Sequence, residues 1–251
     1  MKKLFTIVTI IVLFSVSLFA VEKKQLIFYC GITMVKPMTE IAKIIEKKHN
    51  VKISISQGGS KDLLDSLIFS KKGDLFLPGS ESYLINNKNQ NLFDMQKLIG
   101  YNKAAIFVQK GNPKNITVLD DLFKTNTNTM LCDDQAGSIG RESKKILVAF
   151  NGEEYYYDLF DRAISIGTDS RNLNKSLKDK TIDATINWKS TAFFPENINF
   201  IDVIDIDEKY AKPKKLVIAR LAFSENKDIA NDFIEFTASK EGQEIMRNYG
   251  F

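Results

Sequence analysis

Four short segments combine glycine with hydroxyl side chains, the residue types that bind anions through hydrogen bonds. They read Cys-Gly-Ile-Thr at 30–33, Gln-Gly-Gly-Ser at 57–60, Ala-Gly-Ser-Ile-Gly at 136–140 and Gly-Thr-Asp-Ser at 167–170. Each follows a short apolar run and precedes an amphipathic one, so each is expected to join a strand to a helix. A helix start carries unpaired backbone N–H groups and a partial positive charge of about half a unit. If the four starts converge, they form a cage of donors for an anion.

The same composition has a simpler interpretation. Ser, Thr, Asp and Gly are the preferred residues at the start of a helix, where they cap the backbone. A single junction of this kind therefore indicates a cap, and only the presence of four favours a binding site. None of them has the spacing of a phosphate loop or of a dinucleotide-binding loop.

The composition argues against several other classes of protein. The chain has one histidine, His49, in a polar helix end, and two cysteines, Cys30 and Cys132, far apart in the sequence. This set lacks the close spacing of zinc ligands and offers no general base beside a nucleophile. We therefore expect no enzyme, no metal centre and no cofactor. The net charge is +4, and basic residues form short scattered groups rather than one stripe, so we expect no nucleic-acid partner.

Residues 1–20 have the pattern of a cleaved signal peptide. Lys2 and Lys3 precede an uncharged, mostly apolar run from 4 to 20, which ends in Ser-Leu-Phe-Ala. This run is short for a membrane-spanning helix, and the small residues at its end favour cleavage over an uncleaved anchor. We expect the mature chain to begin near Val21 and to be exported to the periplasm.

Short apolar runs alternate with longer amphipathic ones along the rest of the chain. Strands are expected at 25–30, 51–56, 74–77, 103–110, 129–132, 163–166, 184–187, 198–204 and 215–223, and helices at 33–48, 60–71, 140–150, 170–179, 227–238 and 240–248. The alternation predicts an α/β fold with mainly parallel sheets flanked by helices. Two long runs, at 103–110 and 215–223, bracket the middle unit and predict a two-strand hinge between two lobes.

The expected boundaries are 21–105 for lobe I, 106–214 for lobe II, and 215–251 for a return to lobe I with the C-terminal helices. Ligands of parallel sheets bind at the carboxyl ends of strands, so the junctions, two from each lobe, are expected to meet in the interlobe cleft. Cys30 and Cys132 end the first strand of each lobe, and we expect their sulfurs on facing walls of the cleft. A disulfide needs Cα atoms within roughly 7 Å and would staple the lobes. We expect two free, largely buried thiols.

Motifs along the whole mature chain carry a family resemblance. They include Gly-Asp-Leu-Phe-Leu at 73–77, Asp-Ser-Arg at 169–171, Gly-Gln-Glu-Ile-Met at 242–246 and the terminal Tyr-Gly-Phe at 249–251. With these motifs the chain resembles the ModA-type molybdate-binding proteins of ABC importers, which are type II periplasmic binding proteins. The resemblance implies a small oxyanion ligand, molybdate or tungstate first, held in the cleft without a full counter-charge. It also implies a membrane permease as the partner of a monomeric binding protein.

Carried over by position, the resemblance implies hydroxyl donors at Thr33 and Ser60, backbone donors at Ile139 and Ser170, and an indole donor at Trp188, where the family has a tyrosine. Trp188 could equally be a core or hinge aromatic. Neighbouring residues that could also contact the ligand are Gly31, Gly59, Ser138, Gly140, Arg141 and Arg171.

The first two junctions depart from the family pattern, because 29–33 is one residue longer than usual and 57–59 reads Gln-Gly-Gly. Similar lobed proteins bind other anions, including small phosphorylated acids, so such ligands stay open. A receptor that reports its ligand to a sensor kinase or a chemoreceptor would have the same sequence pattern. In either role, ligand binding is expected to close the hinge.

Overall fold

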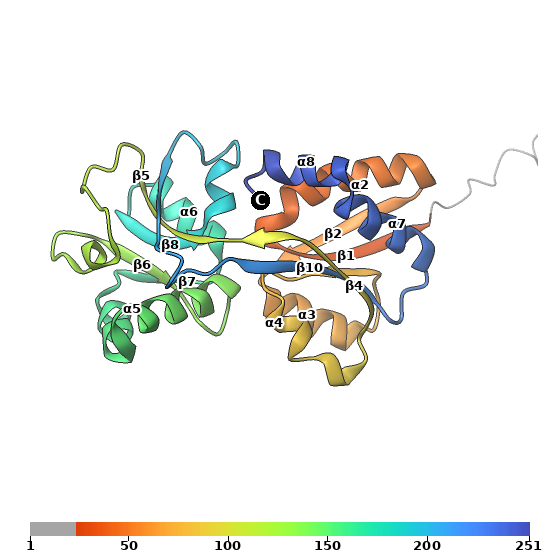
Figure 1. Ribbon diagram of the computed structural model, residues 1–251, viewed down its shortest axis with the longest axis horizontal. Helices are drawn as coiled ribbons and strands as arrows, with labels where there is room; N and C mark the ends of the chain where they lie inside the picture. The colour runs from red at the N-terminus through yellow and green to blue at the C-terminus, as the bar shows by residue number, and fades with distance from the viewer. Residues whose placement is uncertain (1–23) are drawn as a thin grey trace, which may run out of the picture.

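Two five-stranded sheets, each flanked by helices, lie side by side in the computed structural model (Figure 1). The structure describes residues 24–251, so the expected signal peptide at 1–20 lies outside the described residues. Between residues 24 and 251, every helix is too short or too polar to span a bilayer.

The sheet of the first unit, lobe I, has the strand order β2-β1-β3-β10-β4. Strand β1 is parallel to β2 and β3, whereas β10 is antiparallel to both of its neighbours, β3 and β4. The strands are β1 (Gln25–Gly31), β2 (Lys52–Gly58), β3 (Leu75–Leu77), β4 (Phe93–Asn102) and β10 (Lys214–Leu221). The helices are η1 (Ile32–Met34), α2 (Val35–His49), α3 (Ser60–Ser70), α4 (Ser82–Ile85), η2 (Lys88–Gln90), α7 (Lys227–Ala238) and α8 (Lys240–Asn248).

Helices cover both faces of the lobe I sheet because its central strands are apolar on both sides. Leu26, Phe28 and Cys30 of β1 belong to the core formed with α2, α7 and α8, where the Phe28 and Phe233 rings meet edge to face. Tyr29 points the other way, into the core beneath α3 and α4. This two-sided burial is what a near-continuous apolar strand predicts for a parallel sheet.

The second unit, lobe II, has the strand order β7-β6-β8-β5-β9. Strand β6 is parallel to β7 and β8, and β5 is antiparallel to β8 and β9. The strands are β5 (Ala104–Gln109), β6 (Thr129–Cys132), β7 (Ser165–Gly167), β8 (Ala184–Trp188) and β9 (Ile201–Asp205). The helices are η3 (Leu119–Phe123), α5 (Ser138–Arg162), α6 (Ser170–Lys178) and η4 (Lys189–Phe193).

The chain crosses between the sheets twice. It leaves lobe I where β4 passes through Lys103 into β5, and it returns from β9 to β10 through residues 206–213. In Figure 1, β4 and β10 run next to each other through the middle of the molecule. The prediction of two α/β lobes linked by two crossings is confirmed, although the return crossing, residues 206–213, is a loop between strands. The expected boundary at 105/106 falls within β5, and the one at 214/215 falls at the start of β10.

Two elements differ from the sequence prediction. The ten-residue strand β4 was not expected, because one of its faces is polar and it lies at the edge of the sheet, so its apolar residues form no continuous run. Helix α5 is longer than the expected 140–150, since the chain resumes helical geometry after a break at Asn151 and Gly152. Gly152 has φ of +91°, a conformation that glycine adopts without strain.

Candidate functional site

The four glycine-rich junctions meet between the lobes, where they enclose a small space that we call the inner cavity. Lobe I lines it with Gly31, Ile32, Thr33, Gly58, Gly59, Ser60 and Gly79, and lobe II lines it with Gly137, Ser138, Ile139, Asp169, Ser170 and Trp188. The structure thus brings together all five principal candidates and, of the further ones, Gly31, Gly59 and Ser138.

Gly140, Arg141 and Arg171 do not line the inner cavity. A side chain at Gly140 would overlap the carbonyl oxygen of Asp133, so this glycine lets α5 pack against the end of β6. The Arg141 guanidinium lies 4.0 Å from the centre of the Tyr83 ring in lobe I. Arg171 forms an ion pair of 3.0 Å with Asp169. Arg141 therefore bridges the two lobes, and Arg171 braces the start of its own helix.

Three of the four junctions lack a side-chain cap. The residues that precede η1, α3 and α5 are Gly31, Gly59 and Gly137, and none of these starts has a side-chain hydrogen bond to its backbone. Only α6 is capped, because the Asp169 carboxylate accepts hydrogen bonds from the backbone N–H groups of Arg171 and Asn172. The simple capping interpretation therefore fits one junction, while the other three direct backbone N–H groups toward the space between the lobes.

Two hydroxyl groups in the cavity are oriented by protein donors. The Ser60 Oγ accepts a hydrogen bond from the Gly79 N–H at 3.0 Å, and the Ser138 Oγ accepts one from the Trp188 indole N–H at 3.1 Å. A hydroxyl that accepts from the protein keeps its own proton for another acceptor. Both serines are therefore set up to donate, which suits an anion.

Thr33 is placed by a polar contact that the sequence did not suggest. Its Oγ1 accepts from the Asn102 side chain at 3.4 Å and donates to the Met34 sulfur at 2.6 Å. Because a thioether is a weak acceptor, the Thr33 hydroxyl can donate its hydrogen bond to a ligand oxygen instead and gives up only a weak bond. Asn102 ends β4, the strand that the sequence analysis missed, so no pattern linked it to Thr33.

Trp188 is a core aromatic residue whose indole N–H makes a hydrogen bond inside the site. It is 1 % exposed and belongs to the lobe II core, and its indole N–H donates to the Ser138 Oγ. The indole therefore orients the Ser138 hydroxyl. This role combines the two that the sequence allowed, a core aromatic and a hydrogen-bond donor in the site. Gly79 was also missed, because the helix that follows it, α4, has only four residues, too few to form a recognisable helical run.

Among the residues that the structure describes, Asp169 is the one carboxylate that lines the inner cavity. Its oxygens accept from the backbone N–H groups of Arg171 and Asn172 at 2.7 and 3.1 Å, and from the Arg171 guanidinium. These bonds offset its charge, so the surroundings of the cavity remain dominated by donors. Within residues 24–251, no cluster of His, Cys, Asp and Glu could hold a metal ion.

The lobes are in contact across the inner cavity. A methyl group at Gly79 would overlap the Ser138 Oγ, and one at Gly59 would come within 3.1 Å of the Ala136 carbonyl oxygen. The cavity measures only about 10 Å³, which is room for the centre of roughly one water molecule. A tetrahedral oxyanion is larger, so the lobes must separate to admit it.

Both cysteines are free and buried, as expected, but their positions differ from the prediction. Cys30 lies in the lobe I core and Cys132 in the lobe II core, and neither lines the inner cavity. The expectation that the sulfurs sit on facing walls of the cleft is wrong, because each strand directs its last apolar side chain into its own lobe. Burial raises the pKa of the Cys132 thiol to about 12, so it stays protonated at neutral pH.

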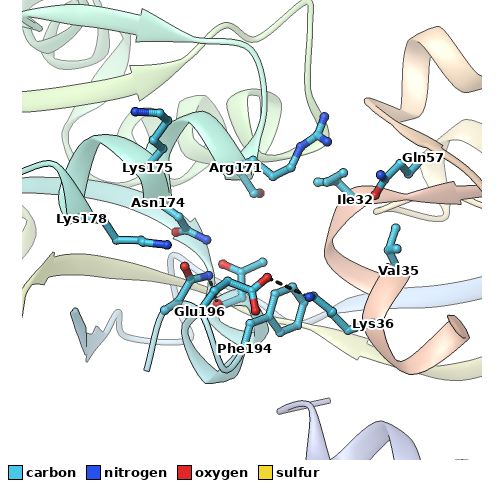
Figure 2. Close-up of a pocket in the computed structure, with 13 residues that line it drawn as sticks. Ile32, Val35, Lys36, Gln57, Arg171, Asn174, Lys175, Lys178, Phe194 and Glu196 are labelled. Atoms are coloured by element: carbon cyan, nitrogen blue, oxygen red, sulfur yellow. Dashed lines mark hydrogen bonds and ion pairs between the residues drawn. The ribbon is translucent and has the colours of Figure 1, made fainter. Parts of the chain in front are cut away.

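A second, larger space adjoins the inner cavity, and we call it the outer pocket. It has a volume of about 300 Å³ and shares Ile32 and Ser170 with the inner cavity. Figure 2 shows residues of α2 facing residues of α6 and of the segment after η4 across this pocket. Its remaining lining residues are Val35, Lys36, Gln57, Arg171, Asn174, Lys175, Lys178, Thr191, Phe194, Glu196 and Asn197.

Residues 26–251 match the family model described as bacterial extracellular solute-binding protein. The chain belongs to this family. A Haemophilus influenzae protein named "Putative binding protein" is 24 % identical over 256 residues, which cover all of this chain and 98 % of that protein. Members of this family are extracellular solute-binding proteins, of the type that serves ABC transporters.

Solved structures with the same fold bind several kinds of anion. The periplasmic molybdate-binding protein of Azotobacter vinelandii has a TM-score of 0.75 at 11 % identity, covering 90 % of this chain and 97 % of its own. The sulfate-binding protein SubI of Mycobacterium tuberculosis has a TM-score of 0.78 at 14 % identity, covering 91 % and 86 %. The L-phospholactate-bound PEB3 has a TM-score of 0.72 at 19 % identity, covering 90 % and 98 %. At these identities the likeness establishes the fold and leaves the ligand open.

Proposed function

We propose that this solute-binding protein captures a small tetrahedral oxyanion group in the inner cavity and presents it to the membrane permease of an ABC importer. In this proposal it is a periplasmic monomer without enzymatic activity. The units 21–105 plus 215–251 and 106–214 move as two bodies around the crossing strands. Thr33, Ser60, Ser138, Ile139 and Ser170 supply the donors, and Trp188 holds Ser138 in place.

One observation carries the proposal. Three helix starts without side-chain caps converge on the inner cavity together with two hydroxyls whose oxygens already accept protein hydrogen bonds. Every one of these groups can donate, and an acceptor-rich anion is the ligand that such a set favours. A cation would need oxygen ligands, and the only carboxylate in the cavity is already bonded to Arg171 and to the backbone.

Two ligand classes follow from this set of donors. Molybdate and tungstate are the first, supported by the motifs of the sequence and by the molybdate-binding neighbour. A small phosphorylated acid is the second, supported by the cationic outer pocket that adjoins the cavity and by the phospholactate-bound neighbour.

Thermal unfolding with a panel of anions tests the proposal. Molybdate, tungstate, sulfate, phosphate and phospholactate are compared at equal ionic strength, with chloride as the reference. A ligand at 100 times its Kd stabilises the folded state by about 2.7 kcal/mol, which raises the Tm by about 5–10 °C for a chain of this length. If none of these anions shifts the Tm at millimolar concentration, the inner cavity is not an oxyanion site.

A further inference from the structure

The outer pocket is unusually rich in cationic side chains for a space between two lobes. Lys36, Arg171, Lys175 and Lys178 line it, against a single carboxylate, Glu196. Most of these charges are already matched. Lys36 pairs with Glu196 at 3.1 Å, Arg171 pairs with Asp169 at 3.0 Å, and Lys175 pairs with Asp179.

Lys178 is the exception. Among the residues that the structure describes, no carboxylate lies within ion-pair distance of its ammonium group, which instead lies 5.4 Å from the centre of the Phe200 ring. In Figure 2 the Lys178 side chain extends from the end of α6 into the pocket, between Asn174 and Glu196. The pocket therefore contains one ammonium group without an ion-pair partner among the described residues, since Glu196, whose pKa Lys178 helps to lower from a distance, is already paired with Lys36.

Asn174 supplies a second unmatched donor beside Lys178. Its Oδ1 accepts a hydrogen bond from the Asn187 side chain at 2.8 Å, and this fixes the side-chain amide so that its NH₂ group faces away from Asn187. Figure 2 shows the amide nitrogen of Asn174 directed into the pocket. Asn174 itself is buried, so this orientation is held by the lobe II core.

The outer pocket is continuous with the inner cavity. Ser170 and Ile32 line both spaces, and Ser170 begins α6, the helix that also carries Asn174 and Lys178. A molecule larger than a bare oxyanion, bound with one anionic group among the donors of the inner cavity, would extend past Ser170 into the outer pocket, on the side of Asn174 and Lys178. A bare tetrahedral oxyanion would occupy only the inner cavity.

We infer that the ligand is a small phosphorylated carboxylic acid, whose phosphate group binds in the inner cavity and whose carboxylate binds to Lys178 and Asn174 in the outer pocket. This inference rests on the proposed oxyanion site and adds the chemical class of the molecule that carries the oxyanion. The volume of about 300 Å³ is at the small end of metabolite pockets, which suits an acid of a few carbons.

Isothermal titration calorimetry with three probes tests this inference. The probes are molybdate, phospholactate, and propane-1,2-diol 2-phosphate, in which a hydroxymethyl group replaces the carboxylate of phospholactate. Phospholactate is expected to bind at least about tenfold more tightly than the diol phosphate, as for one hydrogen bond to a charged partner. Lys178→Gln should weaken phospholactate binding by about tenfold and leave the diol phosphate and molybdate within about twofold.

Lys180→Gln is the matched control. Lys180 lies just beyond α6 and lines neither space, so its replacement removes the same charge without touching the pocket. The inference is overturned if phospholactate and the diol phosphate bind equally, or if the two variants weaken phospholactate binding to the same degree. In those cases binding of molybdate or of either phosphate ester still supports the oxyanion site. If none of the three probes binds and none of the panel anions raises the Tm, the proposed function itself fails.

Discussion

Ser60 and Ser138 each accept a hydrogen bond from a protein N–H, so each hydroxyl oxygen is the acceptor in that bond and the hydroxyl proton is left to donate to a ligand. The donors come from different parts of the fold: the Gly79 backbone in lobe I and the Trp188 indole in lobe II. Both serines are also the first residue of a helix, so their own backbone N–H groups are unpaired as well. Each therefore offers two donors to one ligand.

Ser60→Ala is expected to weaken binding of the cognate anion by about 1.5–3 kcal/mol, because a hydrogen bond to a charged partner is lost. It should also lower the free energy of unfolding by about 1–3 kcal/mol, since the buried Gly79 N–H loses its acceptor. Thr33→Val keeps the side-chain shape and should weaken binding with a smaller loss of stability. Calorimetry and urea unfolding measure the two effects. If both variants bind like the parent protein, Thr33 and Ser60 are not ligand donors.

Site residues that lie at helix starts could be predicted from the sequence, whereas site residues elsewhere could not. Thr33, Ser60 and Ser138 could be predicted because each follows a strand and precedes a helical run. Gly79 and Asn102 could not, since one lies in a loop and the other ends an edge strand. Their roles depend on contacts with residues distant in sequence, which periodicity does not report.

Helix starts with a glycine cap and helix starts with a carboxylate cap differ in what they offer to an anion. The starts of α3 and α5 have glycine caps and open backbone N–H groups, whereas α6 and η3 use carboxylates. In η3, the Asp121 carboxylate accepts from the backbone N–H groups of Thr117 and Val118 at 2.6 and 3.2 Å. A carboxylate at a helix start repels an anion, so glycine caps are what leave the cleft receptive.

Asp121 predicts a measurable dependence of stability on pH. Burial acts to raise its pKa, but hydrogen bonds from Lys124 and from the Thr117 and Val118 backbone outweigh this and lower the pKa to about 2. The folded pKa is depressed from 3.8, so the stabilisation is fully present above pH 4 and is lost as the pH falls toward 2. Asp121→Asn should therefore destabilise the protein by about 2 kcal/mol at pH 7.

The difference between Asp121→Asn and the parent protein should shrink between pH 4 and pH 2, as measured by urea unfolding at a series of pH values. Asp158→Asn, on the exposed face of α5, is the control and should change stability by less than about 0.5 kcal/mol. A constant difference down to pH 2 would show that Asp121 does not act through its charge.

Most elements could be predicted because the chain alternates apolar strands with amphipathic helices of ordinary length. Strand β4 escaped detection because the polar residues Asp94, Gln96 and Lys97 interrupt its apolar pattern. The second half of α5 escaped because the glycine at 152 indicates a helix end, and only tertiary packing shows that the helix resumes. Element types followed from local patterns, whereas edge strands and breaks depended on the assembled fold.

The two lobes close onto each other through contacts that leave no room for an added methyl group. The Gly79 backbone lies against Ser138, and a Cβ at Gly79 would come within 3.2 Å of the Ser138 Cβ. Within its own lobe, the nearest atom to that Cβ would be the Ser60 Oγ at 3.6 Å, which is an ordinary contact. Gly79 therefore matters for the closed arrangement more than for lobe I itself.

Gly79→Ala is expected to hold the lobes apart without unfolding either of them. In the parent protein, small-angle scattering should show a smaller radius of gyration on addition of a bound anion, whereas the variant should compact less and bind more weakly. Ser66→Thr is the control, because it adds a methyl group on the exposed face of α3 in the same lobe, and Ser66 does not line the inner cavity. Equal compaction in the parent protein and Gly79→Ala would contradict the closure model.

The place of β10 between β3 and β4 has a consequence for how the protein folds. Ala219 pairs with Phe76, and Lys214 pairs with Asn102, so the lobe I sheet is incomplete until the C-terminal part of the chain arrives. The lobe II sheet, in contrast, uses only strands between residues 104 and 205. Contacts between distant residues form slowly because closing a long loop costs entropy. Once lobe II has folded, its strands β5 and β9 lie side by side, so the two ends of lobe II are close together. The loop that must close before β10 can pair with β3 and β4 is then much shorter. Folding of lobe II therefore assists the assembly of lobe I.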